Sequence, residues 1–86
     1  MTRAELLRLG AARLAAVGLA GRAEARLDAE VLLAHALGLP RLTMLLDTSR
    51  PVGDSESRRF EELLARRETG EPVAYITGVR EFWSLE

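Results

Sequence analysis

Apolar and polar residues alternate along most of this chain with the period of an α-helix rather than that of a strand. The first such run stands behind Thr2 and Glu5, whose spacing is that of a capping box, and it stops at Gly18. Glycine readily takes the left-handed conformation that closes many helices. The pattern therefore predicts a first helix between Thr2 and Gly18.

A second helix is predicted over residues 24–37. Residues 31–37 are apolar almost all round, apart from His35, which is typical of a helix that is enclosed by the rest of the protein. We therefore expect this helix to be the most buried of the domain. Within it, Val31, Leu32 and His35 are predicted to lie largely inside.

Two further helices are predicted in the middle of the chain. A short one over residues 41–46 carries three leucines, and a loop rich in turn-forming residues follows over 47–53. The fourth helix is predicted to be capped by Asp54 or Ser55, residue types that are common at helix N-termini. Its inward-facing residues are Phe60, Leu63 and Leu64.

The last part of the pattern contains three breaks. Gly70 closes the fourth helix, Pro72 suits the start of a fifth, single-turn helix, and Gly78 stops it. Residues 81–86 then have the pattern of a β-strand. The predicted fold class is all-α, a small five-helix bundle with one strand attached. Because a lone strand has no ladder for its backbone groups, we expect the 86 residues to be part of a longer protein.

Composition narrows the class of protein. Twelve basic and thirteen acidic residues give a net charge of −1, so no bulk field draws the chain to DNA or to anionic lipid. The chain has no cysteine, which excludes disulfides, thiolate metal sites and cysteine nucleophiles. No apolar run approaches the roughly 18 residues of a membrane span, and no signal-peptide pattern is present. We expect a soluble, cytoplasmic protein that has no membrane contact.

The sequence holds no catalytic or metal-binding constellation. His35 is the only histidine and has no second ligand or nucleophile at a fitting spacing, so a hydrogen-bonded structural role is expected. Asp28 and Glu30 are two residues apart and do not share a helix face, which favours stabilisation of the helix end over a carboxylate pair. The glycines stand singly, so no phosphate-binding loop is predicted.

Five residues near the C-terminus are candidates for contact with a partner or with another domain: Arg66, Arg67, Tyr75, Phe82 and Trp83. The two arginines point about 100° apart on a helix, so one is expected to pair with Glu62 while the other serves a partner or its own helix end. Tyr75 is amphipathic and suits either the core or an interdomain seam. Phe82 and Trp83 lie on alternate faces of the predicted strand, where a further domain is expected to cover them.

Two blocks of the chain resemble a known family. Residues 27–38 read LDAEVLLAHALG, and residues 66–83 contain RR, GEPVAYITG and EFW in that order. In order and spacing they resemble the N-terminal domain of the HemK/PrmC family, the release factor glutamine methyltransferases. The resemblance covers nearly the whole chain, and its most specific part is the block from Gly70 to Trp83.

The resemblance implies a helical substrate-recognition domain over residues 1–78. Residues 79–86 would then begin a β-hairpin linker to a methyltransferase domain that uses S-adenosylmethionine. Such a parent protein methylates the glutamine of the Gly-Gly-Gln motif in bacterial class 1 peptide-chain release factors. Its expected partners are these release factors and its own catalytic domain.

The motifs that carry catalysis in this family lie outside the sequence. The family's glycine-rich cofactor motif and its Asn-Pro-Pro-Tyr motif both lie downstream of residue 86. No catalytic, cofactor-binding or metal-binding residue is therefore assigned here. The fragment alone is expected to be inactive and to bind no S-adenosylmethionine.

Two other functions remain as alternatives. Residues 29–46 also resemble a helix-turn-helix, two short helices around Gly38, as in DNA-binding modules. The second of these helices would offer only Arg41 and Thr43 to the bases, so direct DNA binding is not expected. A free-standing protein-interaction domain is the other alternative. Salt-dependent DNA binding would distinguish the DNA-binding module from the other two functions.

Overall fold

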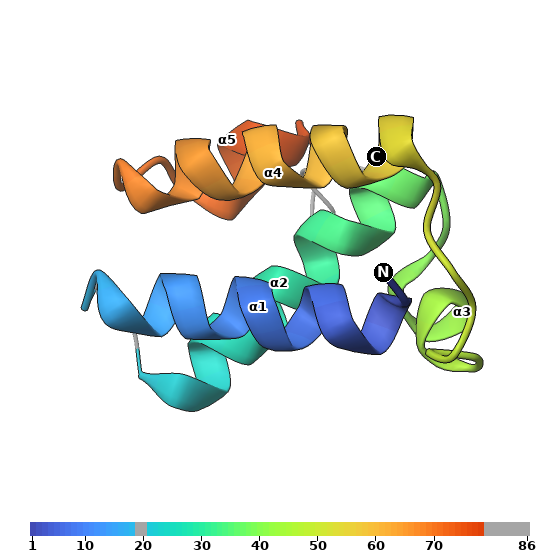
Figure 1. The fold of residues 1–86 in the computed structure, drawn as a ribbon. Helices are drawn as coiled ribbons and strands as arrows, with labels where there is room; N and C mark the ends of the chain where they lie inside the picture. The colour runs from blue at the N-terminus through green and yellow to red at the C-terminus, as the bar shows by residue number, and fades with distance from the viewer. Residues whose placement is uncertain (19–20, 79–86) are drawn as a thin grey trace.

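The computed structural model describes residues 1–18 and 21–78 and has five helices in this part of the chain. In order they are α1 (Arg3–Ala16), α2 (Arg22–Leu37), α3 (Arg41–Leu45), α4 (Asp54–Glu68) and α5 (Val73–Thr77). Helices α1 and α4 lie side by side, α2 crosses behind them, α3 lies at one end, and α5 lies beside α4 (Figure 1). The predicted all-α five-helix bundle is confirmed, while the strand predicted over residues 81–86 lies outside the described residues.

The helix ends follow the capping and glycine signals of the sequence. The Thr2 hydroxyl accepts a hydrogen bond from the backbone N–H of Glu5 at 3.2 Å, and the Glu5 carboxylate accepts one from the N–H of Thr2 at 2.7 Å. The predicted capping box is therefore formed. Gly38 and Gly78 end α2 and α5 with φ angles of 71° and 72°, a left-handed conformation that glycine adopts without strain.

Helix α2 begins at Arg22, two residues before the predicted start. The carboxylate of Glu24 reaches back and accepts a hydrogen bond from the N–H of Gly21 at 3.4 Å. A glutamate at the third helical position thus satisfies an amide that the helix itself leaves unpaired, which fixes the start two residues earlier.

The N-cap of α4 differs from the prediction by one residue. The cap is Gly53, and Asp54, predicted as a possible cap, is the first helical residue. The side chain of Glu56 folds over Gly53, where an added Cβ would lie only 2.7 Å from its Oε1 atom. This carboxylate is the far end of a flexible side chain and can move aside, so the contact does not by itself require glycine at the cap.

The core lies between α1, α2 and α4 and is mostly aliphatic. Phe60, Leu63 and Leu64 of α4 are buried, so their predicted inward orientation is confirmed. Helix α1 approaches α4 closely at Gly10, where an added Cβ would lie 2.8 Å from Cζ of Phe60. The core side chains are Leu6, Leu7, Leu14, Ala25, Ala29, Leu32, Leu33, Ala34, Ala36, Met44, Val52, Phe60, Leu63, Leu64 and Ile76.

Helix α2 contacts each of the other four described helices, and it contributes more buried residues than any of them. Its predicted place at the centre of the domain is confirmed. Of the three residues predicted inside, however, Leu32 is fully buried whereas Val31 and His35 are only half-buried. The packing helices cover the side of α2 that carries Leu32 and leave the opposite stripe in contact with water.

Helix α3 packs on the bundle through Met44, which is fully buried, while Leu42 and Leu46 are 70% and 85% exposed. The guanidinium of Arg3 holds its C-terminal end. Its Nη1 atom donates to the carbonyl oxygens of Met44 at 3.0 Å and Asp47 at 3.2 Å. The start of α1 is thereby tied to the end of α3, whose last carbonyls would otherwise lack partners.

Replacing Leu32 with alanine should lower the free energy of unfolding by about 2–5 kcal/mol, because it leaves a cavity in a closed core. Leu42→Ala is the matched control: it removes the same atoms from a side chain that is 70% exposed, and its cost should stay near 0.5 kcal/mol, the usual order for surface changes. Urea unfolding of the two variants measures the difference. Equal small losses would show that α2 is not the centre of the core.

Candidate functional site

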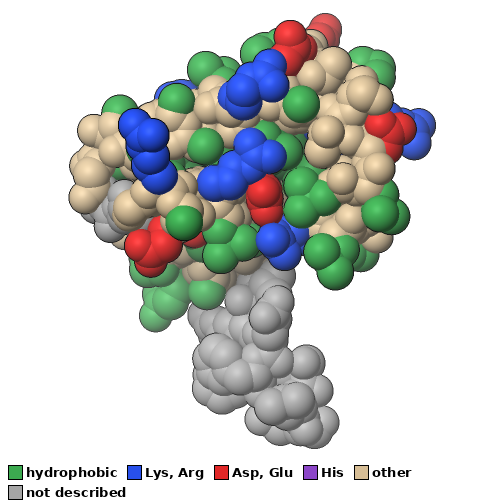
Figure 2. Space-filling model, turned by 90° about the horizontal axis from the view of Figure 1, so that it is seen from below, with side chains coloured by type: hydrophobic (Ala, Val, Ile, Leu, Met, Phe, Trp, Pro, Cys, Tyr) green, Lys and Arg blue, Asp and Glu red, His purple; other side chains and the backbone are tan. Residues whose placement is uncertain are grey.

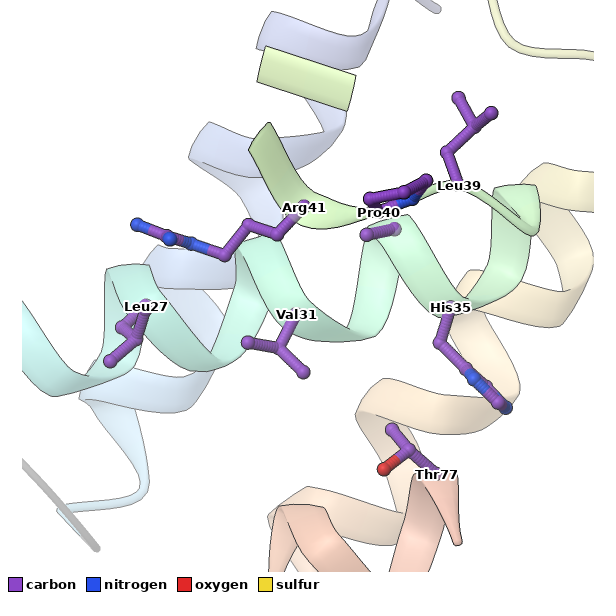
Figure 3. Close-up of a pocket in the computed structure, with 8 residues that line it drawn as sticks. Leu27, Val31, His35, Leu39, Pro40, Arg41 and Thr77 are labelled. Atoms are coloured by element: carbon purple, nitrogen blue, oxygen red, sulfur yellow. The ribbon is translucent and has the colours of Figure 1, made fainter. Parts of the chain in front are cut away.

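An open groove of about 410 Å³ runs along α2, between the α2–α3 turn and the end of α5 (Figure 3). Leu27, Val31 and His35 follow one another at intervals of four residues and form one stripe along its wall. This stripe explains why Val31 and His35 are not inside the core. The complete lining is Leu27, Val31, Ala34, His35, Leu39, Pro40, Arg41 and Thr77.

His35 lies on the α5 side of this groove, near Thr77 (Figure 3). Its predicted role as a hydrogen-bonded core histidine is not seen, since the described residues give its ring no hydrogen bond and it is half-buried. The described residues also contain no group of three side chains suited to hold a metal ion. His35 therefore serves as a wall of the groove.

A buried carboxylate lies beside the groove. Glu30 accepts hydrogen bonds from Nε of Arg26 and from Nε of Arg41, both at 2.9 Å. Burial disfavours the charged form and is the largest single influence, but the two guanidinium groups together outweigh it and hold the pKa of Glu30 below its usual value. The ionised carboxylate ties α2 to the first residue of α3 and fixes one edge of the groove.

Asp28 and Glu30 do not stabilise a helix end, contrary to the prediction. Helix α2 begins at Arg22, so both carboxylates lie beyond its first turn. Asp28 instead accepts a hydrogen bond from Nε of Arg67 at 3.1 Å, which joins α2 to α4. The prediction that the two carboxylates point to different sides of the helix is correct, and each holds a different neighbouring helix.

The two adjacent arginines at the end of α4 bind different partners. Arg66 donates through Nε to the carboxylate of Glu71 at 3.0 Å, and Arg67 binds Asp28. The hydrogen bond and the opposite charge lower the pKa of Glu71 and raise that of Arg66. The predicted pairing of one arginine with Glu62 is therefore wrong, because both arginines reach beyond their own helix.

The other candidate contact residues are Tyr75, Phe82 and Trp83, and their role stays a prediction. Tyr75 is 66% exposed on α5. Phe82 and Trp83 lie outside the described residues. Sequence reasoning missed Glu71, which binds Arg66, and it missed the groove, although the spacing of Leu27, Val31 and His35 was a readable signal for an uncovered stripe.

The face shown in Figure 2 carries both positive and negative side chains. Arginine and acidic side chains alternate there with apolar ones. None of the described helices has the length and apolar character that crossing a bilayer requires.

These features define a small helical domain with an open apolar groove. Residues 5–78 match the family described as the PrmC N-terminal domain, and the chain therefore belongs to this family. The resemblance that was seen in the sequence is confirmed.

Several similar proteins are named release factor glutamine methyltransferase. The protein of Aliivibrio fischeri is 49% identical over 67 residues, which make up 78% of this chain and 24% of the relative. The protein of Pseudomonas aeruginosa is 50% identical over 62 residues, with coverages of 72% and 22%. That of Escherichia coli strain K12 is 47% identical over 60 residues, with coverages of 70% and 22%. The matched region thus spans less than a quarter of each relative, and no solved structure matches the chain.

Glu30→Gln should cost about 1–2 kcal/mol of stability at neutral pH, the low end for charged hydrogen bonds, because Arg26 and Arg41 remain partly in water. The lowered pKa means that ionised Glu30 stabilises the fold above its unfolded pKa of about 4.3, and that this contribution is lost as the pH falls through the folded pKa. Urea unfolding at pH 7, 5 and 3 should show the difference between variant and parent shrinking at the lowest pH. A difference that stays constant down to pH 3 would contradict the ionic role.

Proposed function

We propose that this chain is the substrate-docking domain of an S-adenosylmethionine-dependent methyltransferase. The parent enzyme would methylate the glutamine of the Gly-Gly-Gln motif in bacterial class 1 peptide-chain release factors, and would do so in the cytoplasm. The observation that carries the proposal is the family match over residues 5–78, together with relatives that are named release factor glutamine methyltransferases.

The described residues do not fit the cofactor. Their glycines with positive φ stand singly at helix ends, at Gly18, Gly38, Gly70 and Gly78, and form no loop that could hold the cofactor. No step of methyl transfer is therefore assigned to these residues. In the proposed enzyme, the part of the protein that the relatives have beyond this domain supplies the cofactor site and the catalytic groups.

A docking role answers a requirement of the chemistry. An amide nitrogen is a weak nucleophile, so methyl transfer to it depends on holding the reacting atoms close together and in line. A separate domain that holds a large protein substrate meets this requirement. The apolar groove supports such a role, because Leu27 is 45% exposed and Val31 only half-buried on the most firmly packed helix.

The DNA-binding alternative has little support in the geometry. Helix α3, which would enter the groove of DNA, is only five residues long. Arg41, one of the two side chains that it would offer to the bases, is bound to Glu30. We therefore do not propose a nucleic-acid partner.

The isolated 86-residue chain should bind no S-adenosylmethionine and transfer no methyl group. Isothermal titration calorimetry of the fragment with the cofactor tests this expectation. Saturable binding at micromolar concentration would place at least part of the cofactor site in this domain and would refute the proposed division of labour.

Removing residues 1–78 from the full-length parent enzyme should lower kcat/KM for an intact release factor by at least about tenfold, since the substrate loses the domain that orients it. The Kd for S-adenosylmethionine should stay within about twofold of the parent value, a change of about 0.4 kcal/mol, because the deletion leaves the proposed cofactor site in place. A steady-state methylation assay and calorimetry provide the two measurements. Undiminished activity of the truncated enzyme on the release factor would overturn the docking role.

A further inference from the structure

We infer that Arg67 is a positioning residue, which fixes the direction in which α5 leaves the bundle and hence the place of the protein beyond Gly78. The inference rests on the proposed function, because positioning matters for catalysis only if the parent enzyme docks its substrate on this domain. It assigns Arg67 a role in orienting the domain and no contact with substrate or cofactor.

The guanidinium of Arg67 joins three segments. The residue stands in the last turn of α4, and its Nε atom donates to Oδ2 of Asp28 on α2 at 3.1 Å. Its Nη1 atom donates to the backbone carbonyl of Glu71, in the turn between α4 and α5, at 3.2 Å. The side chains of Arg67 and Asp28 are only 17% and 20% exposed, so water and salt screen this pair much less than a surface pair.

Arg66 holds the same turn from the other side. It forms a two-pronged pair with the carboxylate of Glu71, so that the side chain of Glu71 binds one arginine and its backbone carbonyl binds the next. Pro72 follows directly and fixes its own φ at −63°, and a residue before proline is restricted to extended conformations. The turn into α5 is therefore held at the backbone as well as at the side chain.

Helix α5 depends on this turn for its direction. It has five residues, far fewer than an isolated helix needs to be stable. Among the described residues of α5, Ile76 alone is buried, while Val73 packs partly against the core. Ile76 and Val73 pack α5 against the core, where the helix contacts α2 and α4. The bond from Arg67 to the carbonyl of Glu71 adds a polar anchor where the chain enters α5, and this anchor helps to set the direction of the helix axis.

A change in the direction of the α5 axis would displace the part of the protein that follows this domain. Helix α5 ends at Gly78, and the named relatives are more than four times as long as the region that they share with this chain. A small tilt of α5 is amplified with distance from the bundle. Displacements on the order of 1 Å between reacting groups can cost about 100-fold in rate, so the fixed turn has a direct consequence for a docked substrate.

Arg67→Met in the full-length parent enzyme tests the inference. It keeps the apolar stem of the side chain and removes both hydrogen bonds. We expect kcat/KM for an intact release factor to fall at least about tenfold, with the Kd for S-adenosylmethionine unchanged. Arg67→Lys should fall between the parent and Arg67→Met, because an ammonium lacks the planar fork that reaches Asp28 and Glu71 together.

Arg13→Met is the matched control. Arg13 binds Glu61 at 2.8 Å and Glu68 at 2.7 Å, which ties α1 to α4 with a side chain that is 28% exposed. The substitution removes a guanidinium of similar connectivity and leaves the bonds to Glu71 in place. It should lower the melting temperature without lowering kcat/KM. An equal loss of kcat/KM in both variants would show that Arg67 acts only through the stability of the domain, and it would overturn the inference.

Asp28→Asn covers the case in which Arg67→Met does not fold. Asparagine keeps the shape of the side chain and leaves the bond from Arg67 to Glu71 in place, but it removes the charge pair. We expect it to lower kcat/KM by a smaller factor than Arg67→Met does. Circular dichroism and thermal melting establish that each variant is folded. Full activity of these variants on the release factor, together with loss of activity when residues 1–78 are deleted, would support the docking function of the domain and refute the positioning role of Arg67. If the deletion also has no effect, the proposed function itself fails.

Discussion

Helix α2 has to satisfy two opposite demands, because all the other described helices pack on it. It must bury an apolar face against α1 and α4, and it must also carry the charges that hold its neighbours in place. Small residues such as Ala25, Ala29 and Ala36 let the backbones approach closely on the core side. Asp28 and Glu30 then project about 200° apart, and one reaches α4 while the other reaches α3. The same helix therefore provides the core and the alignment of its surroundings.

The helix ends could be predicted from the sequence because their causes are local. Thr2 and Glu5 are three residues apart and satisfy each other's backbone groups, whatever the rest of the chain does. Gly38 and Gly78 stop helices because a left-handed residue is needed at those positions. The two starts that were displaced, at Arg22 and Asp54, both follow a glycine cap with a glutamate at the third position. In α2 the glutamate accepts from the N–H of the cap residue itself, whereas the amides to which a Ser or Thr cap would bind have no side-chain cap, so this start signal is harder to recognise.

The ion pairs could not be predicted in the same way. Neighbouring charges at i,i+4 are visible in the sequence, and they suggested that Arg66 pairs with Glu62. In the folded chain Arg66 binds Glu71 and Arg67 binds Asp28, which is 39 residues away in the sequence. The pair of Arg67 with Asp28 is well covered and is therefore stronger than a surface pair, while Arg66 reaches both carboxylate oxygens of Glu71 across the turn that follows its helix. The sequence identified the right arginines but not their partners.

The burial of α2 shows a second limit of pattern analysis. A run that is apolar on every side predicts a helix that is enclosed on every side, and Leu32 meets this expectation. Val31 and His35 do not, because the bundle has too few helices to cover the stripe that they share with Leu27. Apolar side chains that a small domain cannot cover by itself are costly unless another surface meets them. The stripe of Leu27, Val31 and His35 is left partly open to water beside Thr77 at the end of α5, and the sequence pattern alone could not show which side of α2 the bundle leaves uncovered.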